Sequence, residues 1–284
     1  EFGWLKGIWY SLFHAISSFC NAGFDLLGDS LANHQQNVYL IMVVSALIIS
    51  GGLGFIVWRD LLEYHQKKKM TIHSKIALTV TGTLLLGGFV VFFFTEHNGA
   101  TLVEGNMFQR LANTFFMSVT PRTAGYYSVD YLHMSHAGLI LTMFLMYIGG
   151  TSGSTAGGLK TTTLGVLLIQ MRSMLKGRTR AEAFGRTIRQ GAVLRALTLF
   201  FITLTLCVVA IMILSVTETI PKTSGIEYIA FEVFSAFGTV GLTMGLTPDL
   251  TAIGKLIIIA LMYIGRVGVL TVVFSLMTKA QRTQ

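Results

Sequence analysis

The sequence predicts an all-α protein that crosses a membrane several times and carries short re-entrant loops between its helices. Three uncharged runs, at positions 38–57, 76–95 and 197–216, each have about 20 residues, the length that spans ~30 Å of hydrocarbon. The composition agrees, since 52% of the residues are hydrophobic and only 12% are charged. Backbone groups in lipid must find hydrogen-bond partners within the protein, so these runs are expected to be helices.

A repeated pattern is the third observation. An aromatic-rich stretch runs three times into a small, glycine-centred turn, with a phenylalanine ten residues before each glycine. Glycine allows positive φ angles that turn successive carbonyls the same way, and converging carbonyls can replace the hydration shell of a cation. We therefore expect the turns to line a cation-selective filter. The residues concerned are Asn21, Ala22, Gly23, Phe24, Thr120, Thr123, Ala124, Gly125, Gly238, Thr239, Val240 and Gly241, preceded by Phe13, Phe115 and Phe231.

Each turn is expected to belong to a unit of four parts: an outgoing helix, a half-helix that re-enters the membrane, the glycine turn and an incoming helix. The carbonyl end of each half-helix carries roughly half a negative charge, which favours a cation. In the middle unit the parts are 76–95, 107–119, 120–126 and 137 onward, and in the last unit they are 197–216, 226–237, 238–243 and 252 onward.

The unit boundaries are expected at 1–57, 58–176 and 177–284. The first of these lacks an outgoing helix, whereas the other two are complete. A ring around one ion closes naturally with four loops, and three are found. We therefore expect a pseudo-fourfold arrangement of channel-like repeats in which these are the second, third and fourth, with the N-terminal repeat absent from this chain.

Charge placement predicts the orientation. Fourteen of the twenty-one lysines and arginines lie at 59–75, at 172–195 and after position 277. By the positive-inside rule these segments, including the C-terminus, are cytoplasmic, and the glycine turns then approach from outside. The net charge of +8 is attributed to contact with membrane lipids rather than to nucleic acid, although 174–195 could also dock a cytoplasmic partner. We expect a multi-pass protein of the plasma membrane.

A segment rich in glycine and hydroxyl groups interrupts the incoming helix of the middle unit. Each glycine in a helix costs about 1 kcal/mol relative to alanine, so a regular helix is not expected there. At ~1.5 Å per residue from position 137, the break starts about 18 Å below the outer helix end, beneath the turns. We expect a movable gate; the alternative is a passive kink. The segment comprises Gly149, Gly150, Thr151, Ser152, Gly153, Ser154, Thr155, Ala156, Gly157 and Gly158.

Three basic side chains near these features need an explanation. Arg266 lies in the last apolar run, where a central arginine costs at least ~2.5 kcal/mol. We expect it to hydrogen-bond the glycine-hydroxyl segment and hold the gate closed, with snorkelling to the inner interface as the alternative. Lys160 is expected either to oppose cations in the pathway or to anchor the helix at the inner interface. Arg122 is expected to point away from the axis and brace its turn against an acid.

Taken together, these stretches resemble the membrane subunit of the Trk/Ktr/HKT superfamily of potassium transporters, most closely the bacterial Ktr type. The resemblance covers 17–25, 118–126, 149–163 and 235–242. It implies K⁺ at the filter, K⁺ uptake through one axial pathway, and a gate loop at the glycine-hydroxyl segment. It also implies a homodimer on a cytoplasmic ring of nucleotide-binding regulatory subunits. One departure is that Gly241 is followed by Leu242, so no turn carries the full potassium-channel signature.

No enzymatic site and no cofactor are expected. The spacing of Gly153 and Gly158 fits a phosphate-binding loop, but Leu159 precedes Lys160 and a membrane helix replaces the required strand. Within transport, a sodium-coupled potassium symporter is the alternative, and activation by Na⁺ stays open. From another class of function, the chain could be a non-conducting membrane assembly subunit.

Overall fold

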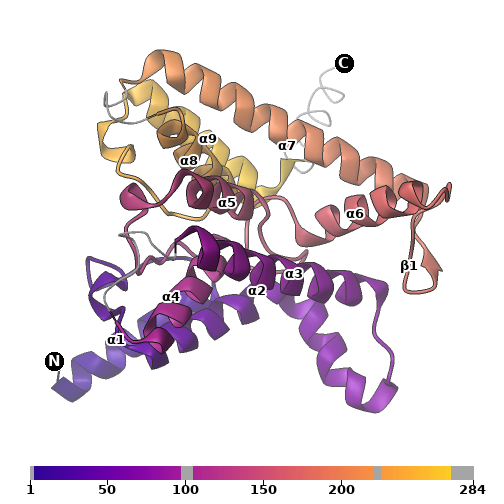
Figure 1. Cartoon of the computed structure of the whole chain (residues 1–284), viewed down its shortest axis with the longest axis horizontal. Helices are drawn as coiled ribbons and strands as arrows, with labels where there is room; N and C mark the ends of the chain where they lie inside the picture. The colour runs from indigo at the N-terminus through magenta and orange to yellow at the C-terminus, as the bar shows by residue number, and fades with distance from the viewer. Residues whose placement is uncertain (1–2, 97–104, 220–224, 270–284) are drawn as a thin grey trace, which may run out of the picture.

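The computed structural model describes residues 3–96, 105–219 and 225–269. Within these ranges the chain is mostly helical, which confirms the predicted all-α class (Figure 1). The expected cytoplasmic C-terminus and the end of the last apolar run lie outside the described residues. The helices are α1 (Gly3–Phe19), α2 (Val38–Lys67), α3 (Ile72–Thr95), α4 (Met107–Val119), α5 (His136–Tyr147), α6 (Thr161–Leu175), α7 (Gln190–Thr217), α8 (Glu227–Gly238) and α9 (Ala252–Val267).

Among the described helices, α2, α3 and α7 are long and apolar enough to cross a membrane. They contain the three predicted runs, but each extends beyond its apolar part, because helical hydrogen bonding continues where the hydropathy falls. α2 differs most from the expectation. It continues to Lys67 and is kinked at Gly54, whose φ of 76° lies outside the helical region. The glycines at 51, 52 and 54 were a sequence signal for this kink, but the analysis of the run rested on hydropathy and length and did not use them.

The short helices match the expected half-helices closely. α4 has the predicted bounds, and α8 is displaced from the predicted 226–237 by one residue at each end. α5 ends at Tyr147, where the predicted break begins. Each short helix packs beside a longer one: α1 on α2, α4 on α2 and α3, and α8 on α7 and α9.

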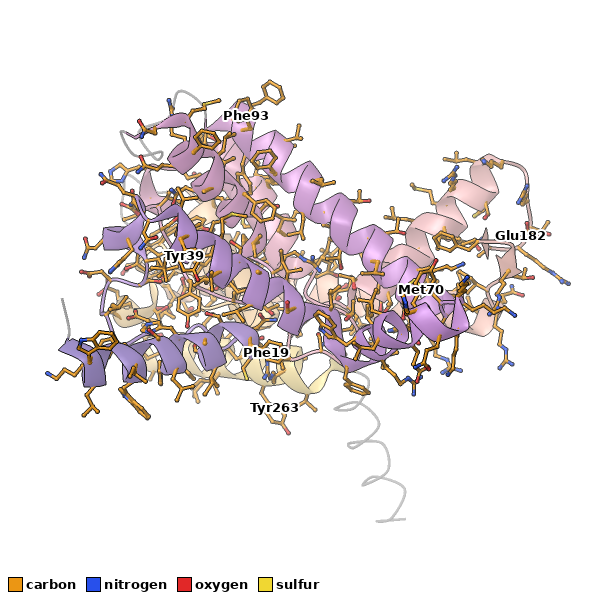
Figure 2. The ribbon with its side chains drawn as sticks, turned by 90° about the horizontal axis from the view of Figure 1, so that it is seen from below. Phe19, Tyr39, Met70, Phe93, Glu182 and Tyr263 are labelled. Atoms are coloured by element: carbon orange, nitrogen blue, oxygen red, sulfur yellow. The ribbon has the colours of Figure 1, made fainter. Side chains whose placement is uncertain are left out.

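A small antiparallel hairpin joins α6 to α7 and was not predicted. Strands β1 (Glu182–Ala183) and β2 (Arg186–Thr187) form it, and Gly185, at φ 73°, lies in its turn. In Figure 2 the hairpin, marked by Glu182, and the turn between α2 and α3, marked by Met70, lie on the same side of the molecule. Tyr39 and Phe93, at the other ends of α2 and α3, lie on the opposite side. The basic segments 59–75 and 172–195 therefore lie on one side, as the charge pattern predicted, while the segment after 277 lies outside the described residues.

The same capping contact occurs twice at the opposite end. Glu96, after α3, accepts hydrogen bonds from the backbone and hydroxyl of Ser135, the N-cap of α5. Glu218, after α7, accepts the equivalent bonds from Thr251, the N-cap of α9, at 2.8 and 2.6 Å. In both cases a glycine three residues after the cap leaves room for the carboxylate. A carboxylate thus joins the end of one helix to the start of another in each copy.

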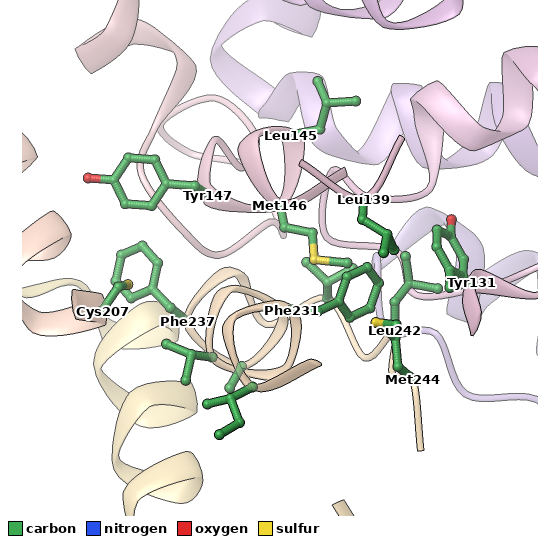
Figure 3. Packing of buried hydrophobic residues seen from close by; sticks show 14 of the residues in the cluster. Tyr131, Leu139, Leu145, Met146, Tyr147, Cys207, Phe231, Phe237, Leu242 and Met244 are labelled. Atoms are coloured by element: carbon green, nitrogen blue, oxygen red, sulfur yellow. The ribbon is translucent and has the colours of Figure 1, made fainter. Parts of the chain in front are cut away.

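The largest core cluster lies between α5 and α8. Figure 3 shows side chains of these two helices, among them Met146, Tyr147, Phe231 and Phe237, gathered in one cluster. Phe231, the phenylalanine ten residues before Gly241, is fully buried here and packs on Tyr131. The repeated phenylalanine at this position therefore anchors its half-helix in the core.

The Glu218 contact predicts a pH-dependent stability. Hydrogen bonds from Thr251 hold the pKa of the Glu218 carboxyl below its ordinary value, so the contact stabilises the fold above about pH 4.3 and is lost as the pH falls through the lowered pKa. Thr251→Val should lower stability by about 1.5–3 kcal/mol at pH 7, with a smaller loss at pH 3.5. Thermal unfolding of the full-length protein in detergent measures this.

The matched control is Thr198→Val, because Thr198 is exposed and bonds only a carbonyl of its own helix, Leu194. It should change the melting temperature little at either pH. A Thr251→Val effect that stays constant between pH 7 and 3.5 would contradict the assignment to Glu218.

Candidate functional site

The three glycine turns share one backbone conformation. Each has positive φ at the first and third of three consecutive residues: 49° and 71° at Asn21 and Gly23, 77° and 83° at Thr123 and Gly125, and 52° and 93° at Thr239 and Gly241. Positive φ is uncommon for asparagine and rarer for the β-branched threonine, so its recurrence at equivalent positions is a property of the turn. Such an alternation allows successive carbonyls to turn toward one side.

The turns are neighbours in space although more than 100 residues separate them. A Cβ atom added to Gly23 would press into the carbonyl of Ala124, and one added to Gly125 would press into the carbonyl of Val240. At Gly241 the nearest atom to such a Cβ is the Cα of Gly125, 4.0 Å away. The three turns therefore follow one another in an arc, from Gly23 to Gly125 to Gly241.

The carbonyls of these turns have no donor. Within the described part of the chain, no hydrogen bond reaches the carbonyl oxygens of 21–23, 123–125 or 239–241. Two residues predicted to line the filter have carbonyls that do accept hydrogen bonds. The Thr120 carbonyl accepts the N–H groups of Ala124 and Gly125, and the Phe24 carbonyl accepts hydroxyl groups. Gly238 ends α8, and no hydrogen bond in the described part of the chain reaches its carbonyl. Among the predicted filter residues, Thr120 and Phe24 therefore lie outside the unpaired set.

Hydroxyl groups hold the turns in place. Ser17 donates to the Phe24 carbonyl at 2.8 Å, and Thr120 donates to the Tyr126 carbonyl, so each of these bonds closes a loop around its own turn. Tyr126 also donates its phenol to the Phe24 carbonyl at 2.8 Å and thereby joins the first turn to the second. The shape of the turns therefore depends on contacts between units.

Glu232 is a buried carboxylate beside the third turn that the sequence analysis missed. It lies in α8, and its two oxygens accept the hydroxyls of Thr243 and Thr247, which follow the turn. The available signal was a second acid, placed after Glu227 in the apolar part of the half-helix. The contact fixes the chain as it leaves Gly241.

The glycine-hydroxyl segment forms a closed loop. The Gly149 N–H donates to the Leu159 carbonyl at 2.9 Å, and the Leu159 N–H donates to the Tyr147 carbonyl at 3.0 Å. The Thr161 N–H donates to the Gly150 carbonyl at 3.0 Å. These bonds bring both ends of the segment together, so α6 resumes beside the point where α5 stops. The segment is non-helical, as its composition predicted.

This loop packs against all three turns from one side. Thr155 donates to the carbonyl of Phe19 at the end of α1. A Cβ on Gly149 would lie 3.3 Å from the Thr123 side chain, and one on Gly157 would press into the Thr239 hydroxyl. The hydroxyls of Thr123 and Thr239 are buried and have no partner in the described part of the chain. They lie between the unpaired carbonyls and the loop.

Residues 151–153 of the loop pack against the kink of α2. Thr151 donates to the carbonyls of Gly52 and Leu53, and the Phe55 N–H donates to the Gly153 carbonyl at 3.2 Å. A Cβ on Gly54 would collide with the backbone of Gly153. The kink therefore provides both room and hydrogen-bond partners for the loop. Ser152 and Ser154 bond Thr162 and the Thr151 carbonyl, respectively.

Two cations meet the loop through its carbonyls. Arg266, in α9, donates to the Thr155 carbonyl. Lys160 donates to the Ala156 carbonyl at 2.6 Å. Arg266 thus contacts the segment that the sequence analysis named, while its role as a latch remains a prediction. Lys160 folds back onto its own loop.

The expectation that Arg122 pairs with an acid was wrong. It is buried and donates to the Gly149 carbonyl at 3.2 Å, so it braces the turn against the backbone of the loop rather than against an acid. A carbonyl can take this role because the loop leaves regular helix here and exposes backbone acceptors.

The sequence of this chain is similar to those of known transport proteins. The family model described as TrkH, cation transport protein, matches residues 3–282. The chain belongs to this family. The resemblance drawn from the turns and the glycine-hydroxyl segment is thereby confirmed, and the family is one of transporters rather than enzymes.

Individual relatives agree. The chain is 82% identical over its whole length to the potassium/sodium uptake protein NtpJ of Enterococcus hirae, and 42% identical over 97% of its length to the Ktr system potassium uptake protein B of Bacillus subtilis. It spans 63% and 61% of those two proteins. The crystal structure of the potassium transporter TrkH from Vibrio parahaemolyticus superposes with a TM-score of 0.76 over 96% of this chain and 59% of that one, at 19% identity, and supports the fold.

The contact between turns predicts a strong effect of a single methyl group. Gly125→Ala places a Cβ against the Val240 carbonyl at a φ of 83°, so we expect stability to fall by about 1–3 kcal/mol. The control Gly191→Ala adds a methyl group near the start of α7, where no atom lies within 4 Å. Thermal unfolding of both full-length variants should show a clear fall for Gly125→Ala alone; equal melting temperatures would refute the close approach.

Proposed function

We propose that the full-length protein takes up K⁺ across the plasma membrane through a single axial pathway lined by the glycine turns. The observation that carries this proposal is the set of carbonyls at 21–23, 123–125 and 239–241, which share one φ pattern and have no donor in the described part of the chain. Unpaired carbonyls at membrane depth are tolerated where they line a path for water or ions. Converging carbonyls can replace the hydration shell of K⁺.

The pathway has pseudo-fourfold symmetry in this proposal. The units 1–57, 58–176 and 177–284 are the second, third and fourth repeats, and their turns are the re-entrant filter loops. A hollow of about 490 Å³ supports this arrangement, because it lies between the first turn and the third and is bordered by Ala22, Gly241 and Met262. The relatives are longer than this chain. A further repeat from the rest of the protein would border this hollow and complete the ring.

The glycine-hydroxyl loop at 149–158, with Lys160, is the proposed gate. Its support is position: it contacts the first turn through Thr155 and approaches the other two turns at Thr123 and Thr239. Arg266 holds this gate closed through the Thr155 carbonyl. Movement of α6, which begins where the loop ends, would then open the path.

The proposed assembly is a homodimer that binds a cytoplasmic ring of nucleotide-binding regulatory subunits. The basic end of the molecule, with the β1–β2 hairpin and the α2–α3 turn, is the cytoplasmic face on which such a ring would act. No cofactor is required in this chain, and membrane lipids rather than nucleic acid contact the basic face.

A sodium-coupled potassium symporter is the second candidate. The observation that supports this candidate is the name of the Enterococcus hirae relative, which is a potassium/sodium uptake protein. Rubidium uptake that disappears without a sodium gradient would identify coupled transport, and uptake that Na⁺ stimulates without needing its gradient would identify activation.

Liposomes that contain the full-length protein test the pathway. Gly→Ser at Gly23, Gly125 or Gly241 should reduce rubidium entry at least about tenfold or abolish its selectivity over Na⁺, because the side chain disturbs the carbonyl array. Gly191→Ser, at an open position of α7, is the control and should retain normal entry. If wild-type protein gives no rubidium entry, the pore is refuted and a non-conducting assembly subunit is favoured.

Removal of the proposed latch should increase rubidium flux, whereas the glycine substitutions should decrease it. Arg266→Ala should raise rubidium flux several-fold, since it deletes the bond to the Thr155 carbonyl. Lys255→Ala is the control, because Lys255 lies near the other end of α9, where it donates to the Pro248 carbonyl and lies in the field of Glu218, away from the glycine-hydroxyl loop. Unchanged or lower flux in Arg266→Ala, at normal expression, contradicts the latch.

A further inference from the structure

A groove runs between α3 and α6 on the side away from the glycine turns. From α3 it is lined by Ile76, Thr79, Val80, Thr83 and Leu84, which recur at helical spacing and form one face about 12 Å long. The groove has a volume of about 490 Å³ and is mostly apolar along the helices. Its α3 wall belongs to the apolar run 76–95, so this part of the groove is at membrane depth.

The other end of the groove is basic. Arg172, Lys176 and Arg178 line it, together with one acid, Glu182, which pairs with Arg178 at 2.7 Å. Arg172 and Lys176 have no carboxylate partner in the described part of the chain. The lining therefore holds two uncompensated positive charges, at the level where apolar helix gives way to the basic segment.

The β1–β2 hairpin closes this end. The Ser173 hydroxyl accepts the Glu182 N–H at 3.2 Å, and the Lys75 ammonium lies 5.6 Å from the centre of the Phe184 ring. These contacts fold the hairpin back onto α3 and α6. The groove thus has apolar walls, a basic end and a lid formed by the hairpin, with its side open.

We propose that this groove binds one anionic glycerophospholipid, with an acyl chain between α3 and α6 and the phosphate at Arg172 and Lys176. Basic pockets between membrane helices at the cytoplasmic side suit anionic head groups, and an apolar trough that continues from them suits a chain. A zwitterionic lipid also offers a phosphate, but its ammonium group would be repelled by these two positive charges and it brings no net charge to offset them. Because α6 starts directly after the proposed gate loop, bound lipid would hold α6 against α3; this consequence rests on the proposed function, whereas the site does not.

Lipid binding is measured directly on the purified full-length protein, without transport. Phosphatidylglycerol and phosphatidylcholine with identical chains are compared by native mass spectrometry. We expect phosphatidylglycerol to be retained about tenfold more, and Arg172→Gln/Lys176→Gln to remove that preference. The control Lys69→Gln/Arg195→Gln removes two exposed basic residues outside the groove and should leave the preference intact.

A second variant tests the chain and keeps all charges. Thr83→Trp fills the exposed apolar part of the groove and should weaken retention of both lipids, while glycerol phosphate, the free head group, should not displace phosphatidylglycerol. Equal retention of the two lipids by wild-type protein overturns the proposal. So does displacement by glycerol phosphate, which would identify a site for a free phosphate, or retention that Thr83→Trp leaves unchanged.

Discussion

Backbone carbonyls of the glycine turns that find no donor in the described part of the chain are the constraint on which the rest of this structure depends. Each would cost free energy in lipid unless a donor or an ion satisfied it, and the proposed pathway would supply that ion. The alternating φ values at Asn21 and Gly23, and at their counterparts, create this unpaired set. Neighbouring elements support the strained turns through bonds such as that from Tyr126 to the Phe24 carbonyl.

The absence of side chains at particular glycines makes the assembly compact. Gly23 and Gly125 allow the turns to touch backbone to backbone, and Gly54 allows the glycine-hydroxyl loop to enter the kink of α2. Arg122 donates to the carbonyl of Gly149, where the loop begins, and Arg266 donates to the carbonyl of Thr155 within the loop. The loop is thereby fixed to several units by hydrogen bonds that can be exchanged, which suits its proposed role as a gate.

Much of the fold could be predicted because its signals are local. Apolar runs of spanning length located α3 and α7, and the spacing from phenylalanine to glycine located α4 and α8. The kink at Gly54, the β1–β2 hairpin and the role of Glu232 were missed. Each depends on a partner far along the chain, such as Gly153 for Gly54, or on a short turn without apolar periodicity.

The sequence by itself determined that the chain is mostly helical, which helices are long and apolar enough to cross a membrane, and which residues can adopt positive φ, because hydropathy, length and backbone freedom act over a few neighbouring residues. Only the tertiary structure decided which carbonyls stay unpaired, that Thr120 and Phe24 are engaged, and that Arg122 binds Gly149 rather than an acid. Those outcomes depend on which distant donors and acceptors meet when the units pack together, and no local pattern encodes that pairing.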